Sequence, residues 1–68
     1  FPNAAVARKS LVAARDLAVG AVVRAEDLVV KRPGDGIAPA HLSHVVGLRL
    51  ARAVTRDVVL TWDDFKHA

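Results

Sequence analysis

The sequence contains no cysteine and very few aromatic residues. Among its 68 residues there is no Cys and no Tyr, with one Trp and two Phe. Without Cys, neither a disulfide framework nor a thiolate zinc site can stiffen the fold, and we expect a cytoplasmic protein. Nucleic-acid-binding proteins commonly combine a massed basic face with stacking aromatics. The scattered Lys and Arg residues and scarce aromatics therefore argue against a nucleic-acid partner.

Long apolar runs are also missing. No run approaches the roughly 20 residues that a membrane-spanning helix requires, so we expect no membrane partner. Residues 1–7 lack the basic start of a signal peptide. We interpret them as a linker in a longer protein and residues 8–68 as one small domain. The net charge is +3, and 53% of the residues are hydrophobic, which is typical of a folded chain.

An internal repeat organises the sequence. Arg15–Leu28 aligns without a gap on Arg52–Phe65 when shifted by 37 positions (52 minus 15). Gly20 falls on Asp57, and both residue types tolerate the unusual backbone angles of a tight turn. Each copy reads as a short strand, a turn, an apolar pair and a one-turn helix. Since so short a unit cannot bury its own apolar side, the two copies must pack together.

The acidic pairs near the end of each copy predict helix starts. Glu26–Asp27 and Asp63–Asp64 are sequence neighbours, which suits a first helical turn better than a facing acid–base pair. Thr61 with Asp64 three residues later approximates a capping box. The predicted fold is mostly β with short helical turns, arranged as a compact pseudo-two-fold domain.

Between the copies, we expect a strand ending at Val29–Val30, then a folded loop and a helix from Pro39 to about Val46. Gly47 is a suitable C-cap for that helix, whereas Ala38 is a poor N-cap. Residues 48–54 read as another strand. Strict alternation would place Arg52 on its apolar face, so Arg52 needs either a bulge or a carboxylate partner such as Asp57 or Asp16.

Catalysis by this chain alone finds no support in the sequence. There is no Cys nucleophile, and neither Ser lies in a nucleophile elbow. His41 and His44, three positions apart, share a face of the predicted helix, but a stable metal site needs a third or fourth ligand. We interpret them as a solvated helix face and expect no metal or other cofactor in this chain.

The loop Lys31-Arg-Pro-Gly-Asp-Gly36 is the strongest candidate for a binding site. Adjacent residues of a strand point to opposite sides, so Lys31 and Arg32 diverge. A rigid Pro33-Gly34 corner would aim one of them outward. The planar guanidinium of Arg suits carboxylate, phosphate or amide oxygens. An ordinary surface turn with flanking charges explains the residues equally well.

Three segments together carry a family resemblance. Arg8–Leu17, Val30-Lys-Arg-Pro-Gly-Asp-Gly-Ile37 and Leu60-Thr-Trp-Asp-Asp64 resemble the C-terminal domain of bacterial N-acetylneuraminate (sialic acid) synthases. That domain belongs to the SAF group and is similar to fish type III antifreeze proteins. The resemblance implies a pretzel-shaped β-clip fold.

What the resemblance implies about function centres on Arg32. Such synthases condense phosphoenolpyruvate with an N-acetylated amino sugar in a TIM barrel that holds Mn or Mg. In a domain-swapped homodimer, the small domain caps the partner subunit's barrel. Arg32 would bind the sugar's N-acetyl group, with Lys31, Pro33, Gly34 and Gly36 supporting the loop. Synthases of legionaminic and pseudaminic acid share this architecture, so the sugar stays open.

Two alternatives follow from the same group. The chain could be a free-standing SAF-type binding module, as in flagellar or pilus assembly chaperones. It could also bind ice, as the fish proteins do. The ice-binding surface falls on Arg15, Arg24, Glu26 and Asp27, and four hydrated charges there make ice binding the disfavoured reading.

Overall fold

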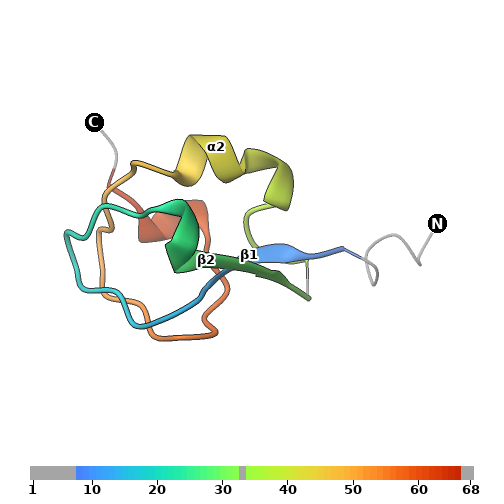
Figure 1. The fold of residues 1–68 in the computed structure, drawn as a ribbon, viewed down its shortest axis with the longest axis horizontal. Coiled ribbons are helices and arrows are strands. Elements are labelled where there is room, and N and C mark those ends of the chain that lie inside the picture. The colour runs from blue at the N-terminus through green and yellow to red at the C-terminus, as the bar shows by residue number, and fades with distance from the viewer. Residues whose placement is uncertain (1–7, 33, 67–68) are drawn as a thin grey trace.

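A computed structural model describes residues 8–32 and 34–66 of the chain. The elements are short strands and helical turns joined by closely packed loops (Figure 1). They are, in order, strand β1 (Ser10–Ala13), 3-10 turn η1 (Ala25–Asp27), strand β2 (Leu28–Lys31), 3-10 turn η2 (Pro39–His41), helix α2 (Leu42–Val45) and 3-10 turn η3 (Trp62–Asp64). The predicted linker, residues 1–7, lies outside the described residues.

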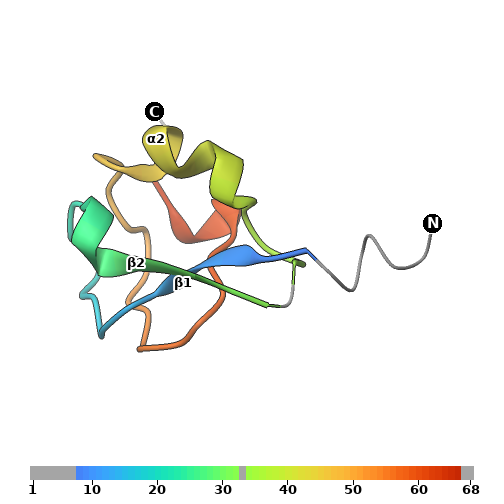
Figure 2. The same ribbon diagram turned by 45° about the vertical axis from the view of Figure 1, so that its right-hand side comes forward.

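The two strands form an antiparallel pair at the centre of the domain. Ser10 lies opposite Lys31, and Ala13 lies opposite Leu28. In both views of the ribbon, η2 and α2 lie on one side of this pair (Figures 1 and 2). The predicted end of a strand at Val29–Val30 is confirmed within β2. β1 was not among the predicted elements.

The predicted packing of the two repeat copies is confirmed by a reciprocal backbone pair. The Leu17 N–H donates to the Val54 carbonyl at 2.8 Å, and the Val54 N–H donates to the Leu17 carbonyl at 2.9 Å. Leu17 and Val54 occupy the same position in the two copies, since 17 plus 37 is 54. The pseudo-two-fold axis therefore passes between these two residues.

Further backbone pairs come in symmetric sets around that axis. The bridge between Val12 and Val59 has its counterpart in the bridge between Arg49 and Val22. The turn N–H of Gly20 donates to the Leu50 carbonyl at 2.9 Å. Likewise, the turn N–H of Asp57 donates to the Ala13 carbonyl at 2.9 Å. Each copy thus bonds to the segment that directly precedes the other copy, which satisfies backbone groups that a single copy would leave unpaired.

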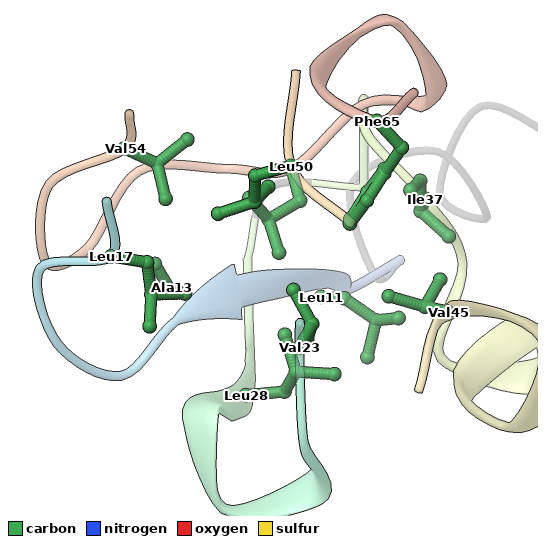
Figure 3. Packing of buried hydrophobic residues seen from close by; sticks show 11 residues of the cluster. Leu11, Ala13, Leu17, Val23, Leu28, Ile37, Val45, Leu50, Val54 and Phe65 are labelled. Atoms are coloured by element: carbon green, nitrogen blue, oxygen red, sulfur yellow. The ribbon is translucent and has the colours of Figure 1, made fainter. Parts of the chain in front are cut away.

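The interlocked copies enclose one apolar core. Side chains from β1, from both copies and from α2 converge on it (Figure 3). Its buried members are Leu11, Ala13, Leu17, Val23, Leu28, Ile37, Val45, Leu50, Val54, Leu60 and Phe65. Burial of this apolar surface is the main stabilising contribution available to so small a domain.

Two buried carboxylates complete the symmetric framework. Asp27 is 1% exposed and Asp64 is 5% exposed. The Arg24 N–H donates to Asp27 at 2.9 Å, and the Thr61 N–H donates to Asp64 at 2.8 Å. Each carboxylate thus caps the 3-10 turn that contains it, which confirms the capping box predicted at Thr61 and Asp64 and gives Asp27 the same role.

Each buried carboxylate also binds an arginine from the start of its own copy. Arg15 Nη2 lies 2.7 Å from Asp27 Oδ1, and Arg52 Nε lies 2.7 Å from Asp64 Oδ1. The expected carboxylate partner of Arg52 is thus confirmed, but it is Asp64 and neither of the two suggested candidates, Asp57 and Asp16. The repeat explains the result, because Arg52 and Asp64 occupy the positions of Arg15 and Asp27.

The elements predicted after the loop are confirmed only in part. The helix expected from Pro39 to Val46 forms as η2 followed by α2, and Gly47 follows it with a φ of 96°. The continuous strand expected over residues 48–54 is wrong. Isolated bridges occur at Arg49, Leu50 and Val54, with a bend between them. That bend turns Arg52 outward, toward Asp64.

The two capped turns yield a matched mutational prediction. Asp27→Ala or Asp64→Ala removes the acceptor for one backbone N–H and one arginine. Each should lower the unfolding free energy by about 1–3 kcal/mol. The exposed sequence neighbours serve as controls, and Glu26→Ala and Asp63→Ala should stay within about 0.5 kcal/mol of the original protein. Urea denaturation measures all four. Equal effects at buried and exposed positions would contradict the capping role.

The pKa of Asp27 predicts a specific loss of stability in acid. The Arg24 backbone N–H, followed by the Arg15 guanidinium, holds this pKa below its ordinary value of 3.8 although burial opposes them. Because the folded pKa is the lower one, the carboxylate contributes its full stability above about pH 4. That contribution is lost as the pH falls through the folded pKa. The stability difference between the original protein and Asp27→Asn should therefore shrink in acid; a pH-independent difference would contradict this.

Candidate functional site

Lys31 forms an ion pair within its own domain. Its Nζ lies 2.9 Å from Asp57 Oδ1. Asp57 belongs to the turn of the second copy, on the far side of β1 from β2, because Val12 of β1 pairs with both Val29 and Val59. The ion pair therefore reaches across β1 and links β2 to the second copy.

Arg32 follows directly and is exposed. Within residues 8–32 and 34–66, no hydrogen bond or ion pair holds its guanidinium. The two adjacent basic residues thus have different surroundings: Lys31 is bound to a carboxylate, whereas Arg32 faces outward. Its five N–H donors are available to a partner outside this domain.

The backbone that follows Arg32 is firmly anchored. The Gly36 N–H donates to Ser10 Oγ at 3.1 Å. The Ile37 N–H donates to the Leu60 carbonyl at 2.9 Å, and the Leu11 N–H donates to the Ile37 carbonyl at 2.8 Å. Ile37 itself is 1% exposed. The loop is therefore closed at both ends, by the pairing of β2 with β1 and by the burial of Ile37.

Close backbone approach explains both glycines of the loop. A Cβ at Gly34 would collide with the Cβ of Arg8 and lie 2.9 Å from its carbonyl carbon. A Cβ at Gly36 would collide with the Leu60 carbonyl oxygen and the Val59 side chain. Both glycines were expected to support the loop. Their close contacts give a reason, which sequence alone did not reveal. Pro33 lies outside the described residues.

Asp57 is the participant that sequence reasoning missed. It was identified as a turn residue, and its φ of 71° bears that out, but it was suggested only as one possible partner of Arg52, whereas it binds Lys31. The hydrogen bond from Lys31 lowers the pKa of Asp57 below its ordinary value, with a further electrostatic contribution from the same cation. The contact spans 26 positions, so no local spacing signals it.

The histidines lie in a separate cluster. The ring centroids of His41 and His44 are 5.8 Å apart, and His41 meets Trp62 edge to face at 5.7 Å. Both histidines are exposed. Among residues 8–32 and 34–66, no three His, Cys, Asp or Glu side chains gather as metal ligands would. The same residues enclose no pocket.

The charges assigned to an ice-binding surface need one correction. Arg15, Arg24 and Glu26 are exposed, but Asp27 is buried. Its carboxylate forms an ion pair with Arg15 and accepts a hydrogen bond from the Arg24 N–H, so it is not a hydrated surface charge. Of the four charges assigned to that surface, three are thus exposed.

Arg32 is thus an exposed guanidinium beside an anchored loop backbone. An exposed guanidinium at a stiffened corner can donate hydrogen bonds to carboxylate, phosphate or amide oxygens. Over the described ranges, no helix is long and apolar enough to span a membrane.

Comparison with known proteins places this scaffold in a family. The SAF domain model matches residues 8–66, and the chain belongs to the SAF domain family. It is 42% identical over 63 residues to N,N'-diacetyllegionaminic acid synthase of Legionella pneumophila subsp. pneumophila, a match covering 93% of this chain and 18% of that enzyme. It is also 33% identical over 58 residues to an uncharacterized protein of Methanocaldococcus jannaschii, covering 85% of this chain and 17% of the relative. The chain thus matches less than a fifth of the length of either relative.

The loop contacts predict that Gly36 does not tolerate a side chain. Gly36→Ala forces a methyl group against the Leu60 carbonyl and Val59, and should lower the unfolding free energy by about 1–3 kcal/mol. Asp35→Ala, at the exposed neighbouring position, should change it by less than about 0.5 kcal/mol. Thermal and urea denaturation measure both variants. An unchanged stability of Gly36→Ala would show that the corner is looser than these contacts imply.

Proposed function

We propose that this chain is the substrate-capping domain of a cytoplasmic synthase of the sialic acid synthase type. In this proposal Arg32 reaches into the catalytic barrel of the partner subunit and binds the N-acetyl group of an amino sugar. The observation that carries the proposal is an exposed Arg32 on an anchored corner, in a chain similar to a legionaminic acid synthase.

Electrostatics supports a covered site. A guanidinium in open water gains little from a single hydrogen bond to an amide oxygen, because water competes for both groups. When a second surface excludes that water, a charged donor contributes about 1.5–3 kcal/mol. The corner therefore gains affinity when a barrel mouth closes over it. Capping of the barrel of the partner subunit in a homodimer would provide this closure.

The substrate class follows from the relative's name and the chemistry of Arg32. The product of that relative carries two N-acetyl groups, as its name states. An acetamido oxygen is a planar acceptor to which a guanidinium can donate. We infer an N-acetylated amino sugar that is condensed with phosphoenolpyruvate. The divalent metal and the groups that perform the condensation belong, in this proposal, to the barrel.

Steady-state kinetics of the full-length protein tests the role of Arg32. Arg32→Ala should raise the KM for the amino sugar about 10- to 100-fold, the range equivalent to one charged hydrogen bond. The KM for phosphoenolpyruvate should not change. Arg32→Lys keeps the charge but loses the planar guanidinium. Its KM for the sugar should therefore lie between those of the original protein and Arg32→Ala.

The matched control is Arg24→Ala. Arg24 is also exposed but precedes η1, at the opposite end of β2 from Arg32. Its replacement should leave both KM values unchanged. If Arg32→Ala left the KM for the sugar unchanged, or if both arginines gave the same effect, the proposed contact would be refuted.

A further inference from the structure

Asp57 has an unusual backbone conformation for its residue type. Among the described residues other than glycine, it is the one with a positive φ, 71°. Its counterpart in the first copy is Gly20, with a φ of 83°. Glycine adopts this conformation without steric cost, whereas a side chain makes it less favourable, although Asp is among the better tolerated residues. The second copy therefore keeps a side chain where the first copy has none.

The side chain at this position makes a contact that glycine could not make. The Asp57 carboxylate lies 2.9 Å from Lys31 Nζ, and Lys31 is the residue directly before Arg32. Backbone strain that persists in a structure commonly marks a functional constraint. Here the contact holds the residue directly before Arg32, which is the proposed sugar-binding residue.

The carboxylate is held in a fixed place. The Asp57 N–H donates to the Ala13 carbonyl at 2.9 Å, and the Ala13 N–H donates to the Val58 carbonyl at 3.0 Å. The turn is also closed by the Val58 N–H, which donates to the Thr55 carbonyl at 3.2 Å. Asp57 is thus fixed to β1, and its ion pair fastens the end of β2 from the other side of that strand.

We propose that Asp57 is a positioning residue, whose carboxylate holds Lys31 across β1 and thereby sets the direction in which Arg32 leaves β2. This inference rests on the proposed function of Arg32. With Lys31 released, the cations at the last residue of β2 and at the residue after it repel each other, and Arg32 samples more directions. A smaller fraction of the protein then has Arg32 ready to bind the sugar, which raises the apparent KM.

The Lys31–Asp57 ion pair is exposed, so its role in positioning Arg32 can be distinguished from a contribution to stability. The side chains of Lys31 and Asp57 are 53% and 59% exposed. Exposed ion pairs contribute little to folding and are screened by salt. Loss of the pair should therefore alter sugar recognition at low ionic strength while leaving the melting temperature nearly unchanged.

The test uses two replacements of Asp57 in the full-length protein. Asp57→Gly removes the carboxylate and places at this turn the residue found in the first copy. Asp57→Asn keeps the shape and tolerance of positive φ but removes the charge. Each should raise the KM for the amino sugar about 2- to 5-fold, within the range of an exposed ion pair. The KM for phosphoenolpyruvate should stay the same.

Two further measurements exclude a merely structural effect. In about 1 M salt, where screening is nearly complete, the KM of Asp57→Asn should approach that of the original protein measured in the same buffer. In an Arg32→Ala background, Asp57→Gly should have no additional effect, because the residue that it positions is gone.

The outcomes distinguish the two proposals. If Arg32→Ala raises the KM for the sugar and both Asp57 variants leave it unchanged, the positioning role is wrong and the function of Arg32 stands. Additive effects in the double variant, or a KM change that persists in high salt, would also overturn the positioning role. If Arg32→Ala itself has no effect, the proposed function fails and the role of Asp57 fails with it.

Discussion

The reciprocal backbone pair between Leu17 and Val54 is the contact around which the domain is organised. It lies on the pseudo-two-fold axis and brings together two copies that could not bury their apolar sides separately. The turn of each copy donates to the segment just before the other copy, where Leu50 and Ala13 accept the two hydrogen bonds. A short chain without disulfides thus obtains a closed core because backbone groups of each copy bond to the other copy or to the segment that precedes it.

The candidate site lies where this symmetry is broken. The loop that carries Arg32 packs its backbone against Arg8 and Leu60 so closely that Gly34 and Gly36 leave no room for a Cβ. These contacts restrict the backbone at Gly34 and Gly36, so that fewer conformations must be lost on binding. The two-copy scaffold supplies rigidity, and the loop between the copies supplies the functional group. That division is common where binding residues are held on loops by a rigid framework.

The sequence predicted what the repeat and local chemistry determine, including the capping role of Asp64 and the turn at Asp57. It did not predict what depends on distant contacts. The partner of Arg52 was missed. The repeat aligns Arg52 with Arg15 and Asp64 with Asp27, so the ion pair of Arg15 with Asp27 has its counterpart in that of Arg52 with Asp64. The ion pair of Lys31 with Asp57 joins residues 26 positions apart, and nothing in their spacing indicates it. The strand expected after Gly47 failed because a bend between isolated bridges replaces regular alternation.

In the proposed function, this small domain contributes the Arg32 guanidinium to a site that another part of the enzyme forms. Its affinity then depends on closure over the corner, because the guanidinium gains most when water is excluded. A crystal structure of the full-length protein with the amino sugar bound tests this most directly. We predict the Arg32 guanidinium within about 3 Å of the acetamido oxygen, inside the barrel of the partner subunit. An Arg32 side chain folded onto its own domain, with the sugar bound elsewhere, would contradict the account.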